Sequence, residues 1–341
     1  MDRNKYRKLV EETASELTSI MDVSLGQRAK DLVKGAMGRS VRVKDPMFWP
    51  AGMLMLGLSE ARAVSGNKEL YMKIDTAMES HVKFWKEHYE GRIDFVDDAL
   101  AGAALVKMYA QTGNQIYKEA ADRILDYLMS APRNAEGAII YNPGRNSSNI
   151  FVDGIGQTVM FLSLYGRVFN NAEALSLAKT QLTNYKKYGM DQRTGLCYHG
   201  YSITEDGAIE KKGLLGWGRA VGWLMLGLSE YSKDNADTEI SDWYRDFCGI
   251  VESYVRKDGG FSWQLQAVEG HLDTSATGML LYGIRTGDIT VLENSTDANG
   301  RVGNALSSCD DFGVHHQTYG YYHWGQGAAL AAISQAVALM Q

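Results

Sequence analysis

Acidic, basic and indole side chains recur in this sequence at the starts of apolar segments. A carboxyl group can act as a general acid or a general base. A guanidinium can hold a carboxylate through two parallel hydrogen bonds, and an indole plane can cover the flat face of a ligand. If the fold brings them together, we expect a binding site for a small, acidic sugar-like molecule. The residues concerned are Trp49, Asp97, Asp98, Asp153, Trp217, Arg219, Asp273 and Trp324.

The same residues also have plain structural interpretations. Asp is a favoured helix N-cap, so Asp98, Asp153 and Asp273 could each cap a helix and do nothing else. The helix dipole favours an ionised carboxylate there, and only burial or a second carboxylate would favour the protonated form. Arg219 lies within the apolar stretch LLGWGRAVGWLML, so its charge needs a partner, either an Asp of the protein or a ligand.

A repeat indicates how the chain positions these residues. Residues 52–61 (GMLMLGLSEA) and 222–231 (GWLMLGLSEY) are identical at 8 of 10 positions. Six apolar, small-residue-rich segments begin at 49, 97, 153, 217, 273 and 324, at intervals of 48 to 64 residues, each long enough for a helical hairpin.

Between the apolar segments lie amphipathic ones, at 67–88, 117–130, 172–187 and 239–255. A helix that is apolar all round must be buried, and a one-sided helix can cover it. The sequence therefore predicts an all-α protein, a six-hairpin (α/α)6 barrel formed as one domain by residues 1–341. The apolar last segment favours a closed ring over an open solenoid, whose end would need a polar face.

Three stretches are not expected to be helical. Residues 133–149 are rich in Gly and Asn, residues 191–213 contain a hairpin signal at Asp206-Gly207, and residues 257–264 contain a Gly-Gly turn. We expect these insertions to lie at the ends of the ring, where they could shape a pocket.

Composition narrows the classes of function. The net charge of −6 argues against nucleic acid or an anionic membrane as a partner. Cys197, Cys248 and Cys309 form no disulfide framework, and the first residues lack the apolar run of a signal peptide, so a cytoplasmic location is expected. His315-His316 has no further ligand spacing and no HExxH, GxGxxG or GxSxG motif is present, so we expect neither a metal nor a cofactor.

Five segments resemble glycoside hydrolase family 105, the unsaturated rhamnogalacturonyl hydrolases, over roughly residues 45–340. They are PRNAEG (132–137), FVDGIGQ (151–157), TGLCYHGY (194–201), WGRAVGW (217–223) and DTSATGMLLYGI (273–284). The resemblance implies an (α/α)6 barrel and an enzyme of pectin degradation. Such an enzyme releases a terminal 4,5-unsaturated galacturonic acid from oligosaccharides of rhamnogalacturonan. An acid protonates C4 of the vinyl ether and water adds at C5.

The resemblance also implies roles for individual residues. Asp153 matches the catalytic acid and base, and Asp97 matches a second acid that holds the substrate and tunes Asp153. Contacts to the unsaturated sugar are implied for His199, Trp217, Arg219 and Trp223. Trp49, Asp98, Asp273 and Trp324 complete the expected substrate-binding set from their places at the starts of the apolar segments.

Two departures from the family pattern leave the substrate open. Tyr201 and Ser202 stand where the family often has Trp-Asp, and residues 139–141 differ at a position that commonly faces the leaving sugar. The alternatives are an unsaturated glucuronyl hydrolase of the related family 88, a sugar 2-epimerase, or a non-catalytic oligosaccharide-binding protein. The expected partner is a small acidic oligosaccharide, and the protein is expected to be a monomer or a homodimer.

Overall fold

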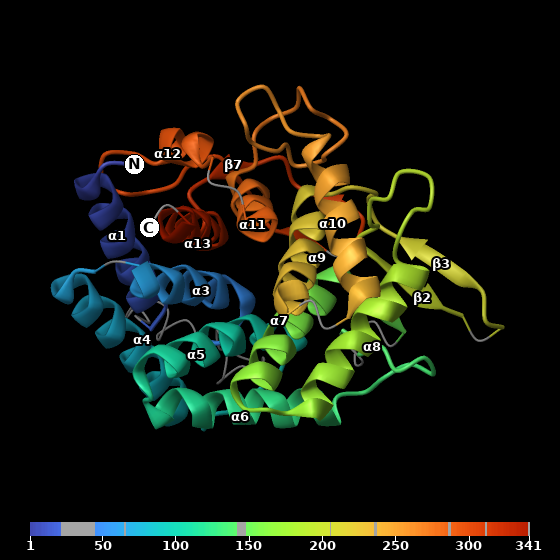
Figure 1. Cartoon of the computed structure of the whole chain (residues 1–341), viewed down its shortest axis with the longest axis horizontal. Helices are drawn as coiled ribbons and strands as arrows, with labels where there is room; N and C mark the ends of the chain where they lie inside the picture. The colour runs from blue at the N-terminus through green and yellow to red at the C-terminus, as the bar shows by residue number, and fades with distance from the viewer. Residues whose placement is uncertain are drawn as a thin grey trace, which may run out of the picture.

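The computed structural model describes residues 1–21, 45–64, 66–141, 148–204, 206–234, 237–285, 288–310 and 312–339. Within these residues the chain forms a ring of helices in two layers (Figure 1). The inner layer consists of α3 (Trp49–Val64), α5 (Ala99–Thr112), α7 (Val152–Val168), α9 (Gly218–Tyr231), α11 (Thr274–Ile284) and α13 (His323–Leu339). Each inner helix packs against the next, and α13 packs against α3, so the ring is closed.

The outer layer covers the inner one. It consists of α1 (Arg3–Met21), α4 (Lys68–His88), α6 (Gln115–Ser130), α8 (Ala172–Tyr188), α10 (Thr238–Glu252) and the short α12 (Thr290–Ser295). Four of these helices begin at an Asn or Asp whose side chain accepts backbone N–H groups of the first turn, namely Asn67, Asn114, Asn171 and Asp237. The predicted (α/α)6 barrel is confirmed, including its closure by the last segment.

Glycines explain the repeated decamer. A Cβ atom on Gly57 would lie 2.6 Å from the carbonyl oxygen of Gly327, and one on Gly327 would lie 2.2 Å from that of Met53. In the second copy, a Cβ on Gly227 would lie 3.1 Å from the carbonyl oxygen of Gly156. The small residues therefore let the backbones of neighbouring inner helices approach closely.

The ends of the inner helices that carry Glu60 and Glu230 form a buried ionic cluster. Nζ of Lys107 lies 2.9 Å from Oε1 of Glu60 and 3.9 Å from Oε2 of Glu230. Burial alone would raise the pKa of Glu230, but the charges of Lys107, Lys233 and Arg167 lower it to about 2. Glu230 is therefore an ion in the interior, held by cations from three other positions.

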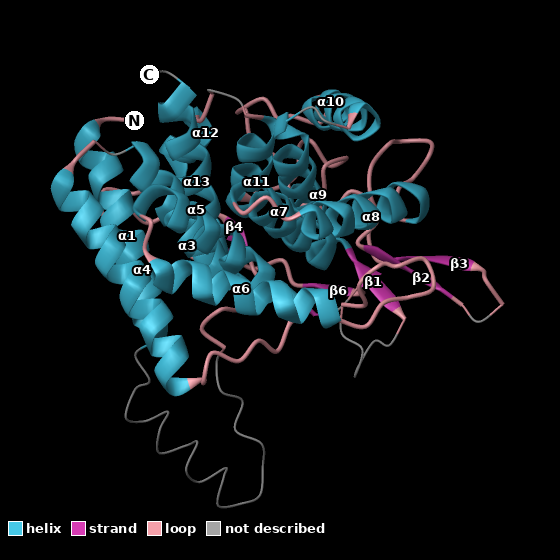
Figure 2. Cartoon of the chain, turned by 60° about the horizontal axis from the view of Figure 1, so that its bottom comes forward, coloured by secondary structure: helices cyan, strands magenta, loops and turns pink. Residues whose placement is uncertain are grey.

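Short strands lie at one end of the ring (Figure 2). β1 (Asn149–Phe151), β2 (Gly200–Ile203) and β3 (Ile209–Lys212) form an antiparallel sheet, which confirms the hairpin predicted around residues 206–207. Two further pairs were not predicted: β4 (Ala305–Leu306) with β7 (Tyr319–Gly320), and β5 (Cys309–Asp310) with β6 (Val314–His315). Of the predicted loop 133–149, residues 142–147 lie outside the described residues. Among the helices that the structure describes, none has the length and apolar character needed to cross a membrane.

Candidate active site

Two acids, one buried and one partly exposed, lie at the starts of neighbouring inner helices. Asp97 lies in the 3-10 turn Val96–Asp98 that leads into α5, and Asp153 lies in the first turn of α7, directly after β1. The side chain of Asp153 is 16% exposed, whereas Asp97 is 2% exposed. Asp153 therefore has the better access to a ligand, and Asp97 lies deeper in the protein.

Asp97 is held from both sides. The hydroxyl of Tyr141 donates a hydrogen bond to its Oδ2, and Nε2 of Gln157 donates to its Oδ1 at 2.9 Å. Burial raises the pKa of Asp97 to about 7, and the nearby charge of Asp153 adds to the rise while the two hydrogen bonds oppose it. Asp97 can therefore hold a proton near neutral pH.

Asp153 also faces a histidine. Nε2 of His199 lies 3.1 Å from Oδ2 of Asp153, and the backbone carbonyl of His199 accepts a hydrogen bond from N of Val152 at 3.0 Å. The His199 ring is packed edge-on against Phe151, at 5.2 Å between ring centroids, and against Trp217 at 4.5 Å. The start of α7 and the start of β2 are thus fixed to each other beside Asp153.

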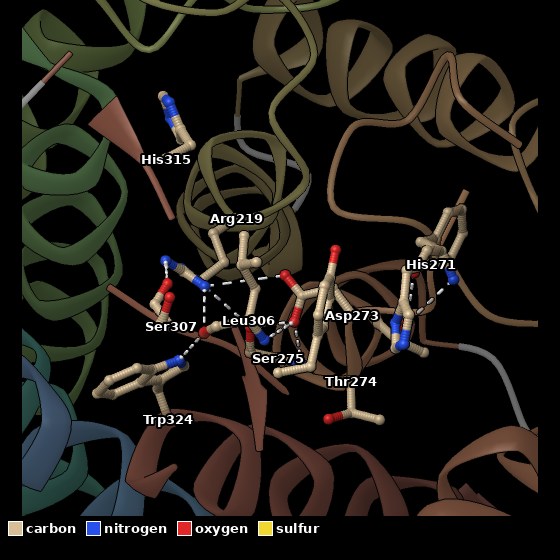
Figure 3. A network of polar contacts seen from close by, with 12 residues as sticks. Arg219, His271, Asp273, Thr274, Ser275, Leu306, Ser307, His315 and Trp324 are labelled. Atoms are coloured by element: carbon tan, nitrogen blue, oxygen red, sulfur yellow. Dashed lines mark hydrogen bonds and ion pairs between the residues drawn. The ribbon is translucent and has the colours of Figure 1, made fainter. Parts of the chain in front are cut away.

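Arg219 is paired within the protein (Figure 3). Nη1 donates to the carbonyl of Leu306 at 2.9 Å and Nη2 donates to that of Ser307 at 2.8 Å. Nη1 also lies 3.8 Å from Oδ2 of Asp273, and the guanidinium lies 4.8 Å from the centre of the Trp217 ring. The sequence left open whether the charge of Arg219 is paired with an Asp of the protein or with a ligand. In the structure its partner is an Asp of the protein, Asp273.

Asp273 interacts both with backbone N–H groups and with Arg219. Its Oδ1 accepts from N of Ser275 at 3.0 Å, which caps α11, and from N of Leu306 at 3.0 Å. Its remaining oxygen, Oδ2, faces Arg219 as an ion pair and accepts no hydrogen bond from the residues that the structure describes. Asp273 and Arg219 together attach the 305–307 segment to the ends of α9 and α11.

Three tryptophans meet at the same end of the ring. The ring of Trp49 lies 4.9 Å from that of Trp324 and 6.1 Å, edge-on, from that of Trp223. Nε1 of Trp324 donates to the carbonyl of Leu306, the same oxygen that accepts from Arg219. Trp49 and Trp324 are only half-buried, so they can offer their faces to a ligand, whereas Trp223 and Trp217 are buried.

Asp98 is turned away from this group. Its Oδ2 accepts from the backbone N of Asp94 at 3.3 Å and of Phe95 at 3.4 Å, and it shares a hydrogen bond with Asp45. Burial, with the charge of Asp45 next, raises its pKa well above the ordinary value. These contacts give Asp98 a structural place in the turn before α5.

Reasoning from the sequence missed several residues around the acids. Tyr141 comes from the loop before β1, Gln157 from the second turn of α7, and His315 from β6. The motif FVDGIGQ contained Gln157, and its spacing of four residues from Asp153 on one helix face was a usable signal. Tyr141 and His315 lie in loops and strands whose placement no helical periodicity indicates.

A family model for glycosyl hydrolase family 88 matches residues 26–303. The chain belongs to the family 88/105 glycosyl hydrolases. It is 23% identical over 210 residues to the unsaturated rhamnogalacturonyl hydrolase YesR of Bacillus subtilis (strain 168), and the match covers 60% of this chain and 58% of YesR. The matching part is thus a little over half of that relative's length.

Solved structures share the fold over nearly the whole chain. A possible member of the GH105 family from Klebsiella pneumoniae superposes with a TM-score of 0.81 at 15% identity, covering 100% of this chain and 95% of that one. The unsaturated glucuronyl hydrolase of Bacillus sp. GL1 superposes with a TM-score of 0.73 at 15% identity, covering 98% and 96%. At this identity the likeness establishes the (α/α)6 architecture.

Proposed function

We propose that this protein is an unsaturated uronyl hydrolase that releases a terminal 4,5-unsaturated galacturonic acid from short oligosaccharides of rhamnogalacturonan. The observation that carries the proposal is the pairing of the buried Asp97 with the more exposed Asp153: burial raises the pKa of Asp97 to about 7, and the charge of Asp153 adds to that rise. Family membership and the name of the relative YesR support the same activity.

The proposed reaction is a hydration. The C4=C5 double bond and the ring oxygen of the sugar form an electron-rich vinyl ether. The protonated carboxyl of Asp153 gives its proton to C4, and positive charge develops at C5 and the ring oxygen. Water then forms a bond to C5 and returns its proton to the carboxylate. The resulting hemiketal opens, and the aglycone leaves with its glycosidic oxygen.

Both acids have a part in this scheme. Asp153, the more exposed, faces the substrate and transfers the proton in both directions. Asp97 lies deeper in the protein, and burial together with the charge of Asp153 raises its pKa to about 7. A separate nucleophile, as in ordinary retaining glycosidases, is not needed. Trp49 and Trp324 would cover the sugar face.

The proposed activity can be tested by measuring the loss of the C4=C5 double bond. The purified protein is mixed with a disaccharide from a galacturonate-cleaving lyase (galacturonyl-rhamnose) or with one from a glucuronate-cleaving lyase (the glucuronyl substrate). Both carry the same unsaturated uronic acid, because C4 has lost its configuration, and they differ in glycosidic linkage and leaving sugar. The near-ultraviolet absorption of the conjugated double bond is recorded. We expect the band to disappear faster with galacturonyl-rhamnose. Faster loss with the glucuronyl substrate would replace the proposed substrate, and persistence of both bands would contradict the proposed activity.

A matched pair of variants separates an enzyme from a binding protein. Asp153→Asn should bind the disaccharide but lose turnover by a factor of about 10² to 10⁴, the usual contribution of a general acid. Asp242→Asn, on the exposed face of α10, should behave as the wild type. Binding without turnover in the wild type would indicate a non-catalytic protein.

A further inference from the structure

A thiol and two imidazoles from three separate segments converge beside the catalytic pair. One ligand atom from each of His199, Cys309 and His315 lies within 4.8 Å of the others. Sequence spacing gave no hint of this cluster because 110 residues separate His199 from Cys309. We propose that these three residues bind a zinc-like divalent cation and that the bound metal inhibits turnover.

The backbone itself places two of the ligands side by side. Cys309 and His315 are directly opposite each other in the antiparallel pair of β5 and β6. Such cross-strand partners present their side chains to the same face of the ladder, with Cβ atoms about 5 Å apart. The third ligand is His199, which lies directly before β2. The centre of its ring is 6.0 Å from that of His315.

Unsatisfied nitrogens mark the cluster as a ligand site. His199 is 1% exposed, and its Nδ1 has no hydrogen-bond partner among the described residues. Nε2 of His315 is likewise buried, and no residue in the described part of the chain forms a hydrogen bond with it. Leaving such atoms unpaired costs free energy, so a metal that binds them would recover that cost. In Figure 3 the ring of His315 points away from the Arg219 network, with no interaction drawn to it.

The donor set indicates the class of metal. Two imidazoles and a thiolate are typical ligands of zinc and similar divalent cations, and they are poor ligands for calcium or magnesium. Tetrahedral zinc bonded at its usual lengths holds its ligand atoms about 3.4 to 3.7 Å apart. The three donors would therefore have to close by roughly 1 Å, which side-chain rotation can supply, and the fourth position would take water.

Asp153 lies where a carboxylate commonly supports a metal-binding histidine. A histidine that binds a metal through one ring nitrogen usually donates the N–H of the other to a carboxylate. Here Nε2 of His199 lies 3.1 Å from Oδ2 of Asp153, which leaves Nδ1 for the metal. A metal on Nδ1 would fix the N–H of His199 on Nε2, where it faces Oδ2 of Asp153. An Asp153 oxygen that is engaged by this N–H is not free to reach C4, so the metal would inhibit; this consequence alone rests on the proposed function.

Cobalt(II) offers a test that does not depend on activity. The full chain is titrated with Co²⁺ alone, and visible and near-ultraviolet spectra are recorded. We expect one equivalent to bind with the intense bands of a four-coordinate ion and a thiolate-to-metal band. In Cys309→Ser and in His315→Gln the thiolate band should be lost or the affinity should fall more than tenfold. Cys248→Ser, which removes a half-buried thiol from α10, should bind as the wild type does.

Zinc inhibition is measured separately on the disaccharide substrate. Zn²⁺ should inhibit the wild type and Cys248→Ser, and Cys309→Ser should keep its metal-free rate and resist Zn²⁺. Unchanged Co²⁺ spectra in both Cys309→Ser and His315→Gln, or a six-coordinate spectrum in the wild type, would overturn the metal site. Cobalt binding by the predicted ligands with no effect of zinc on turnover would leave the site in place and overturn its coupling to Asp153. An inactive protein that still binds cobalt in this way would contradict the proposed function and not the metal site.

Discussion

The hydroxyl of Tyr141 donates a hydrogen bond to Oδ2 of Asp97 from a residue 44 positions further along the chain. A phenol can donate to a carboxylate and can also accept from a protonated acid, so this contact can persist in both states of Asp97. Tyr141 therefore positions Asp97 whether or not Asp97 holds a proton.

Tyr141→Phe should move the pH dependence of turnover. The hydrogen bond from Tyr141 lowers the pKa of Asp97, so its loss should raise that pKa further. We expect the limb of the profile of kcat/KM that reports this group to shift to higher pH, with a loss of rate of about tenfold or more. A change in rate with an unshifted profile would mean that Tyr141 acts only through packing. Tyr198→Phe, in the loop before β2, serves as a matched control.

Asp97 should make the protein less stable as the pH rises. Its pKa is about 7 in the folded protein against an ordinary value of 3.8, so the folded state binds a proton that the unfolded chain releases between these values. The contribution is thus present below about pH 4 and is lost as the pH rises through 7. Asp97→Asn removes this effect, and its stability relative to the wild type should increase from pH 4 to pH 8 by at most about 4 kcal/mol. Denaturant unfolding at the two pH values measures the difference, and equal values would contradict the assignment.

Glu230 should show the opposite dependence. Its folded pKa of about 2 lies below the ordinary 4.5, so its contribution to stability is present above 4.5 and is lost as the pH falls through 2. Glu230→Gln leaves Lys107, Lys233 and Arg167 without this charge and should lower the free energy of unfolding at pH 7 by about 3 to 5 kcal/mol. Glu239→Gln, 70% exposed on α10, should change it by less than about 0.5 kcal/mol. A neutral effect of Glu230→Gln would show that the cluster is not needed for stability.

Arg219→Lys tests how the 305–307 segment is held. The two Nη atoms of Arg219 donate to two successive carbonyls, and one ammonium cannot reproduce this planar fork. We expect a loss of about 1 to 3 kcal/mol in the free energy of unfolding and a higher KM, because the carbonyl of Leu306 also orients Trp324. Arg245→Lys, 73% exposed on α10, is the control. A loss of turnover with unchanged stability and KM would instead favour a direct role in the reaction.

The sequence predicted the ring of helices and the starts of its inner members because periodicity and capping act locally. Asp97 and Asp153 could be predicted from the sequence because each lies close to the first residue of an inner helix. Cys309 and His315 could not, because their place depends on two short strand pairs between α12 and α13 that carry no repeat. The sequence also could not predict which way the side chain of Asp98 points. Adjacent acids in a turn can face opposite sides, and the packing around them determines which side each one faces.

The contact of α13 with α3 joins the last inner helix of the chain to the first. Chain-connectivity entropy makes such a distant pairing slow to form, whereas each hairpin can assemble from near neighbours. We therefore expect the seam between α13 and α3 to form last on refolding and to open first under stress. Because Trp49 and Trp324 sit on the two sides of this seam, indole fluorescence would report its opening before the rest of the ring unravels.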